Sequence, residues 1–276
     1  MQIVVLLKQT FDTEEKIVVT PTGISDKEAK LVINPYDEYA LEEALRQRET
    51  HGGHVRVVAC GTERSEEALR TALAMGADEA VRLEADGLAA EDSSALAAAL
   101  SELISPFAPD LLLAGLFAVD SGSGSVALQV AEILGLPHAA SAVKLEISGQ
   151  ADASASGAIA AEGAAFYAIV ERDVEGDNET VAIPLPALVT AQQGLNEPRY
   201  PSLPGIMKAK KKPLTRVAAD ELASLPDERK AAKTVRAELF APAPRAAGIR
   251  LSGTPSEQAA ELARLLSVSV SASIKL

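Results

Sequence analysis

The segment from Gly115 to Val126 carries the residue types of an anion site. Its polar part consists of Asp120, Ser121, Gly122, Ser123, Gly124 and Ser125. Glycines let backbone N–H groups approach an anion, hydroxyls add donors, and a helix starting near Ser123 adds the positive end of its dipole. A phosphate would fit. The segment matches neither the GxGxxG nor the Walker pattern, so an ordinary tight loop between strand and helix stays an equal alternative.

A second group of candidate contacts lies where other predicted strands end. These candidates are Leu6, Lys8, Cys60 and the helix start Asn34, Pro35, Tyr36 and Asp37. Doubly wound sheets bind ligands at the carboxyl ends of their strands, so the two groups would meet at one edge. The combination suits a nucleotide lying across that edge. For Asn34, a simple N-cap is an alternative that does not exclude ligand contact.

The sequence shows no catalytic constellation. His51, His54 and His138 fall at a predicted helix end, a strand start and a loop, without the spacing of a metal site or a triad. Cys60 has no CxxC partner, and we interpret it as a small buried residue or as one that lines the crevice. We therefore expect no substrate chemistry from this chain alone.

The elements that must position these residues alternate between strand and helix. Strands are predicted over 2–7, 54–59, 79–83 and 110–114, and helices over 34–51, 63–75, 92–105 and 123–134. Such alternation predicts an α/β fold with right-handed crossovers and a doubly wound, mostly parallel sheet. Between the first strand and the first helix, 8–33 forms a polar excursion with two β-rich pieces and a turn at 21–23.

After Pro137 the pattern changes to strands without intervening helices. They are predicted over 142–147, 157–162, 164–172, 180–183 and 184–190, with an antiparallel hairpin at the sheet edge. We expect an α/β nucleotide-binding domain over 1–190, a recognition loop with a basic segment over 191–214, and a C-terminal arm over 215–276. The arm contains predicted helices over 218–225 and from Thr254. Because such an arm buries little of itself, it needs a partner subunit; disorder is the competing interpretation.

Composition narrows the class of protein. Apolar residues make up 47% of the 276 residues, aromatic residues only 3%, and Cys60 is the single cysteine. The formal net charge of −13 argues against nucleic acid as a general partner. The first residues lack the features of a signal peptide, and no apolar run approaches the ~20 residues of a membrane-spanning helix. We expect a cytoplasmic protein without membrane insertion.

The segment 195–212, LNEPRYPSLPGIMKAKKK, is interrupted by prolines and ends in lysines. Its prolines favour extended backbone, so we expect it to project instead of packing. The residues expected at its tip are Leu203, Pro204, Gly205, Ile206, Met207 and Lys208. A partner could cover this apolar group. A linker with a solubilising lysine tail is the alternative.

Five separated segments resemble the β subunit of electron transfer flavoproteins. They are LLKQTFD at 6–12, INPYDEYALEEAL at 33–45, LRTALAMGAD at 69–78, VERDVEGDNETVAIPLPALVTA at 170–191 and LNEPRYPSLPGIMKAKKKP at 195–213. The resemblance runs to about Leu214 and then fades to a shared arm with a terminal helix. It implies an adenine nucleotide α-hydrolase-like fold and a heterodimer with an α subunit that holds most of the FAD.

The resemblance also implies specific roles. The β subunit would hold a buried AMP through Leu6, Lys8, 34–37, Cys60 and 115–126, and would carry electrons from acyl-CoA or other flavin dehydrogenases to a quinone oxidoreductase. The loop 195–210 would dock into dehydrogenases with Leu203 as its anchor, and Asp173 would influence the motion of the flavin domain.

One departure from the family concerns the nucleotide loop, which lacks the usual Gln and Gly near its end. Electron-bifurcating relatives hold a second FAD in place of AMP, and AMP is preferred here because nothing in the loop signals a second flavin. From a different class, a nucleotide-binding sensor module is an alternative, and an adenylating enzyme is a third.

Overall fold

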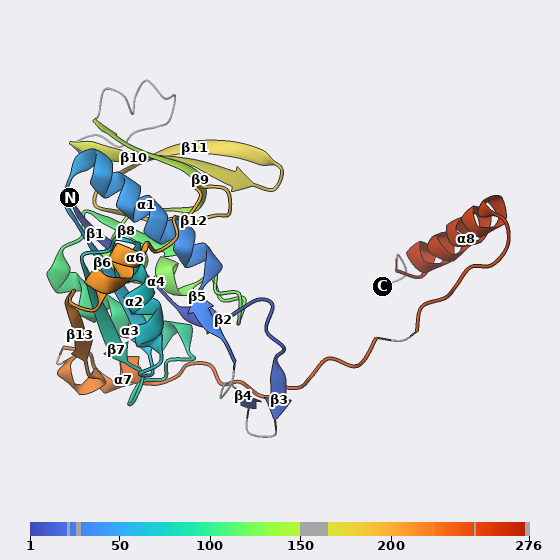
Figure 1. The fold of residues 1–276 in the computed structure, drawn as a ribbon, viewed down its shortest axis with the longest axis horizontal. Helices are drawn as coiled ribbons and strands as arrows, with labels where there is room; N and C mark the ends of the chain where they lie inside the picture. The colour runs from blue at the N-terminus through green and yellow to red at the C-terminus, as the bar shows by residue number, and fades with distance from the viewer. Residues whose placement is uncertain (21–22, 26–28, 150–164, 223, 246, 274–276) are drawn as a thin grey trace. The chain divides into compact units, whose positions relative to one another are not determined.

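The computed structural model describes residues 1–276 except 21–22, 26–28, 150–164, 223, 246 and 274–276. The chain divides into a compact unit, Met1–Ala237, and a second unit, Glu238–Leu276. The compact unit is built on one large sheet with helices on both faces (Figure 1).

The main sheet contains nine strands in the order β11-β10-β9-β12-β8-β1-β6-β7-β13. Their bounds are β1 (Gln2–Leu6), β6 (His54–Gly61), β7 (Glu79–Glu84), β8 (Leu111–Gly115), β9 (His138–Gly149), β10 (Phe166–Val174), β11 (Asp177–Pro184), β12 (Ala187–Ala191) and β13 (Leu214–Val217). The seven neighbouring strands β9-β12-β8-β1-β6-β7-β13 pair in parallel. Strand β10 pairs antiparallel with both β9 and β11. The predicted doubly wound, mostly parallel sheet with an antiparallel edge hairpin is confirmed.

Two hydrophobic cores cover the two faces of this sheet. Helices α1 (Pro35–His51) and α2 (Ser65–Met75) pack on the face that carries Ile3 and Val5. Helices α3 (Ser93–Ile104) and α4 (Val126–Leu134) pack on the face that carries Val4 and Leu6. Continuous apolar strands are buried on both sides in this arrangement, which explains why β1 shows no polar alternation.

The predicted helices differ from the observed ones mainly at their starts. Helix α4 begins at Val126, three residues after the predicted start at Ser123, and helix α2 begins at Ser65. Strand β9 begins earlier than predicted, at His138, because Leu188 of β12 pairs with it there. The strand predicted over 157–162 lies outside the described residues.

Two short ribbons fill the predicted excursion between β1 and α1. Strand β2 (Gln9–Phe11) pairs antiparallel with β5 (Leu31–Ile33), and β3 (Val18–Thr20) pairs antiparallel with β4 (Gly23–Ser25). The β-rich pieces predicted in this excursion are thus confirmed. Part of the predicted turn, residues 21–22, lies outside the described residues.

The expectation of only helical stretches in the arm from residue 215 onward was wrong. Strand β13 pairs in parallel with β7 at the edge of the sheet opposite the hairpin, so Leu214–Val217 belongs to the compact unit (Figure 1). Instead of one helix over 218–225, the chain forms a 3-10 turn, η2 (Ala219–Glu221), and a short helix, α7 (Asp227–Lys230). Leu222 and Leu225 are buried in the core beside α3, so burial of these leucines determines the path.

The second unit contains one helix, α8 (Pro255–Ser273), among its described residues. Its predicted start is confirmed, because the backbone N–H and the hydroxyl of Thr254 donate to Glu257 Oε2 at 2.7 and 2.9 Å. The apolar residues that share a face, including Leu262 and Leu266, are 48% and 57% exposed. Within this unit the helix therefore has an uncovered apolar stripe.

The proline-rich segment before β13 folds differently from our expectation. Residues Leu203–Ala209 form helix α6, capped by the Ser202 hydroxyl, which accepts a hydrogen bond from Gly205 N at 3.1 Å. The helix packs on α2, and a Cβ atom at Gly205 would overlap the carbonyl oxygen of Ala74. The expectation that this segment does not pack was wrong, since Pro204 fits the first turn of a helix and Gly205 permits close contact.

This contact generates a stability prediction. Gly205→Ala should lower the free energy of unfolding by about 1–3 kcal/mol, because neither backbone can yield without lifting α6 from α2. Gly248→Ala is the control, since a Cβ atom there meets open space. Urea unfolding of both variants measures the difference, and equal stability of the two would contradict the close packing of α6 on α2.

Candidate functional site

The carboxyl ends of β1 and β8 meet where the sheet reverses its winding, and the Asp37 carboxylate joins them. Its Oδ2 accepts a hydrogen bond from Lys8 N at 2.7 Å, and its Oδ1 accepts one from Gly115 N at 3.0 Å. Asp37 lies in the first turn of α1 and is 6% exposed. A Cβ atom on Gly115 would overlap Asp37 Oδ1, so only glycine allows this approach.

Asn34 ties the loop after β8 to the start of α1. Its Nδ2 donates to the carbonyl of Phe117 at 2.9 Å, and its Oδ1 accepts from Val119 N at 3.1 Å. Asn34 occupies the N-cap position of α1 but makes no capping hydrogen bond with its side chain. The predicted N-cap position of Asn34 is therefore confirmed, but its amide group holds the neighbouring loop instead of capping the helix.

The loop itself is a tight turn. Gly122 N donates to Ala118 O at 2.8 Å, Ala118 N donates to Ser123 O at 3.0 Å, and Gly122 has a φ of 68° that favours glycine. The backbone of helix α4 begins its hydrogen bonding with Gln129 N to Ser125 O. The N–H groups of the first helical turn have no acceptor within the helix. They and the small residues before them fit an anion such as a phosphate.

The side chains near the carboxyl ends of β1 and β8 form two further contacts. Lys8 Nζ lies 2.7 Å from Asp120 Oδ1, and the rings of Tyr36 and Phe117 lie 4.3 Å apart at 41°. The structure thus brings Lys8, Tyr36, Asp37 and the loop together, as predicted. Pro35 begins α1 and Leu6 ends β1, with Leu6 buried in the core beside α4.

Cys60 lies at the same edge, near the end of β6. Burial raises the pKa of its thiol to about 11, against a smaller opposing effect of Arg82. The thiol is therefore protonated at neutral pH. Both earlier interpretations of Cys60, a small buried residue or a residue lining the crevice, agree with this protonation state.

The docking candidates lie on a different surface, on and around α6. The side chains of Leu203, Ile206 and Met207 are 80%, 44% and 73% exposed, and Tyr200 is 94% exposed. Lys208 is exposed on the same helix, whereas Leu195 at the start of the segment is buried. Asp173 is exposed and lies far from this segment in the sequence, near the turn between β10 and β11, opposite Asn178.

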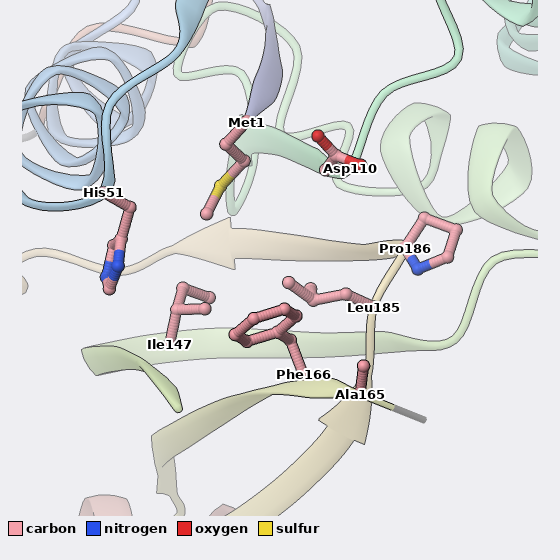
Figure 2. Close-up of a pocket in the computed structure, with 8 residues that line it drawn as sticks. All are labelled: Met1, His51, Asp110, Ile147, Ala165, Phe166, Leu185 and Pro186. Atoms are coloured by element: carbon pink, nitrogen blue, oxygen red, sulfur yellow. The ribbon is translucent and has the colours of Figure 1, made fainter. Parts of the chain in front are cut away.

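A cavity of about 430 Å³ opens near the amino ends of the strands, away from the loop 115–126. It is lined by Met1, His51, Asp110, Ile147, Ala165, Phe166, Leu185 and Pro186 (Figure 2). Met1, Asp110 and Pro186 precede β1, β8 and β12, so the cavity adjoins the amino ends of the strands. The Asp110 carboxylate accepts a hydrogen bond from Gln2 N at 2.6 Å and is thus used within the fold.

Sequence reasoning missed the polar residues that hold the segment 195–212, which is called the docking segment from here on. Glu42 and Glu43 are 3% and 4% exposed on α1, and they bind Arg199 and Asn196. A signal was present, because two glutamates stand directly beside the predicted buried stripe of α1, and buried charges need partners. Phe117 was likewise not singled out, although its carbonyl and ring both contact the helix start.

The strand order and the switch point between β1 and β8 define the class of this chain. It is a doubly wound α/β protein, a class that binds ligands at the switch point of the sheet. A family model described as the electron transfer flavoprotein domain matches residues 22–222. The chain belongs to the electron transfer flavoprotein β-subunit family.

The relatives cover nearly the whole chain. An electron transfer flavoprotein subunit beta from Bacillus subtilis is 49% identical over 267 residues, covering 96% of this chain and 97% of the relative. The namesake from Syntrophomonas wolfei is 38% identical over 276 residues, covering 100% and 99%. A mitochondrial subunit beta from Arabidopsis thaliana is 35% identical over 225 residues, covering 80% and 83%.

Among the described residues, every helix is too short or too polar to cross a bilayer. The same residues contain no cluster of three or more His, Cys, Asp or Glu side chains that could hold a metal ion.

The Asp37 clamp generates a pH prediction. Burial raises the pKa of Asp37 from 3.8 to about 7, although N–H groups of Lys8 and Gly115 and the side chain of Asn34 act to lower it. The folded state therefore binds this proton more tightly than the unfolded state. The stabilisation is complete below about pH 4 and is lost as the pH rises toward 7.

Asp37→Asn removes this titration, and its amide group cannot accept from both backbone donors. The stability advantage of the wild type over Asp37→Asn should shrink by about 2 kcal/mol between pH 5 and pH 7. Asp86→Asn is the matched control, because Asp86 is exposed. Chemical unfolding across this pH range measures the difference, and a gap independent of pH would contradict the raised pKa.

Proposed function

We propose that this chain is the β subunit of a heterodimeric electron transfer flavoprotein. It shares FAD with an α subunit, holds a buried AMP, and carries electrons from acyl-CoA or other flavin dehydrogenases to a quinone oxidoreductase. The carrier works in the cytoplasm and performs no substrate chemistry of its own. The observation that carries this proposal is the near full-length match to proteins named electron transfer flavoprotein subunit beta.

The crevice supports the nucleotide part of the proposal. The N–H groups at the start of α4 would bind the phosphate of AMP, and Lys8, paired with Asp120 of the loop, would supply a positive charge. Asn34 and Asp37 direct their polar side-chain atoms to the backbone of the fold. We propose that they shape the crevice and that the ligand is bound mainly by backbone groups and by Ser121, Ser123 and Ser125.

The second unit supports the heterodimer. Its described residues are largely exposed, and the apolar stripe of α8 has no cover within the unit. Exposed apolar surface of this kind is typical of a segment that packs on another chain. We propose that the arm binds the α subunit. The exposed Asp173 at the hairpin would face the flavin domain of that subunit and influence its motion.

The exposed face of α6 supports docking to dehydrogenases. Leu203 would enter an apolar pocket of the partner, and the neighbouring Lys208, Lys210 and Lys211, all exposed, would steer toward acidic partners. In this proposal Pro204 and Gly205 set the helix start, while Ile206 and Met207 extend the apolar contact.

Purification with an α subunit tests the proposal. Co-expression should yield a yellow heterodimer that releases one FAD and one AMP on denaturation, identified by mass. Release of two FAD molecules would favour the electron-bifurcating type with a second flavin in the crevice. A colourless homodimer that exchanges ATP would overturn the carrier function in favour of a nucleotide sensor.

Leu203→Ala tests the docking surface. Flavin content should be unchanged, because the side chain is 80% exposed and belongs to neither core, while electron acceptance from a dehydrogenase should fall by about tenfold or more. Ile133→Ala is the control, since Ile133 is exposed on α4. Steady-state reduction of the heterodimer by a dehydrogenase provides the measurement, and equal rates for the two variants would exclude Leu203 as the anchor.

A further inference from the structure

The docking segment is fixed to α1 at its amino-terminal side by Arg199. The guanidinium donates to both carboxylate oxygens of Glu42 at 2.8 and 3.1 Å and to both of Glu49 at 2.6 and 3.2 Å. Arg199 N also donates to Glu42 Oε2 at 3.1 Å. Burial acts to raise the pKa of Glu42, and the hydrogen bonds from Arg199 outweigh this effect and lower the pKa.

A second tie lies beside it. Asn196 Nδ2 donates to the carbonyl of Tyr39 at 3.0 Å and to Glu43 Oε2 at 3.1 Å. Asn196 and Glu43 are 9% and 4% exposed. The chain just before α6 is therefore held to α1 by buried polar contacts.

Lys212 fixes the other side of the segment to α2. Its Nζ donates to the carbonyl oxygens of Leu73, Gly76 and Ala77 at 3.0, 3.4 and 2.5 Å. These carbonyl groups lie in the last turn of α2 and directly after it, where helix carbonyls lack partners within the helix, and Gly76 O also accepts from Arg48 Nη1 at 3.0 Å. In return, Arg70 of α2 donates to the carbonyls of Ala209 and Lys212 at 2.7 and 2.9 Å, so hydrogen bonds tie α2 and the end of the segment together in both directions.

Between the two anchors the side chains have opposite roles on opposite faces. Gly205 lies against the backbone of α2, and Ala209 is 3% exposed in the core. Tyr200, Leu203 and Met207 are 94%, 80% and 73% exposed. The inner face is thus packed and hydrogen-bonded, and the outer face presents apolar side chains to solvent.

We propose that Arg199 and Lys212 are positioning residues that hold the docking segment in its binding conformation before a partner arrives. This inference rests on the proposed function, in which α6 docks into a dehydrogenase. Lys212 then differs in role from Lys208, Lys210 and Lys211, because its ammonium group donates hydrogen bonds to carbonyl oxygens at the end of α2 and does not face a partner.

Preorganisation is useful here because exposed apolar side chains on a free loop would have to be ordered on every encounter. That ordering costs free energy and weakens an apparent affinity in proportion to the fraction of competent conformers. Charge-assisted hydrogen bonds to a buried carboxylate and to a helix end are strong enough to hold so short a segment. Loss of either anchor should lower the competent fraction without altering the docked complex.

The first test measures the segment itself, in the full chain as purified from co-expression with the α subunit. Thermolysin cleaves before large apolar residues, so Ile206 and Met207 report opening of α6. Arg199→Gln and Lys212→Gln should accelerate cleavage there by about tenfold, because cleavage of a native protein follows the population of the open form. Lys210→Gln is the matched control for Lys212→Gln, since Lys210 is exposed.

The second test measures docking. Both anchor variants should raise KM for a dehydrogenase several-fold with kcat unchanged, because an assembled complex is the same once formed. Arg199→Lys should lie between the wild type and Arg199→Gln, since an ammonium cannot bridge two carboxylates as a guanidinium does.

The outcomes separate this inference from the proposed function. Cleavage rates equal to those of Lys210→Gln would overturn the anchoring role, whatever the chain carries. Faster cleavage with an unchanged KM would overturn the role in docking. If the wild type accepts no electrons, the proposed function fails, and with it the docking role, while the cleavage result still decides whether the two residues hold α6.

Discussion

The compact unit depends on one carboxylate at the point where its sheet reverses. Strands β1 and β8 are neighbours, yet the helices that follow them, α1 and α4, leave toward opposite faces, so no crossover links the two strand ends. Asp37 links the two strand ends, because its carboxylate accepts hydrogen bonds from the backbone N–H groups of Lys8 and Gly115. A buried carboxylate is costly unless its hydrogen bonds are made, so the residue fixes the separation of the two strand ends within narrow limits. The crevice that a nucleotide would occupy is a consequence of that separation.

Helix α1 holds two separate parts of the compact unit, the loop after β8 and the docking segment. Its first turn holds the crevice through Asn34 and Asp37, and its middle holds the docking segment through Glu42 and Glu43. Between them, Ala40, Leu41, Ala44 and Leu45 are fully buried against the sheet. The same helix therefore sets the positions of the ligand edge and of the docking surface. Because one rigid helix holds both the proposed ligand edge and the proposed docking surface, the distance between them is fixed without any conformational change.

The sequence predicted those features that local pattern determines. Continuous apolar strands, helix starts and the alternation between them gave the sheet, both faces and the residues at its carboxyl edge, because period and capping are properties of neighbouring residues. Contacts between distant segments were not accessible. Strand β13 is too short and too exposed to be recognised without β7, and the contact of α6 with α2 joins segments that are far apart in the sequence. Asn34 shows the same limit, since its position at a helix start suggested a cap whereas its side chain holds Phe117 and Val119.

In the proposed docking, the exposed lysines and the exposed apolar side chains of the docking segment have different roles. The chain carries a formal net charge of −13, so the exposed lysines after α6 form a local exception and not a general field. At physiological salt such charges act within about 8 Å, which is enough to orient a partner that is already near but not to attract one from afar. In the proposed docking, affinity would then come from the few exposed apolar side chains, a contact too small for a permanent complex. In the proposed function a carrier would leave each partner after every transfer, and a small apolar contact on a firmly held helix would provide specific orientation together with rapid release.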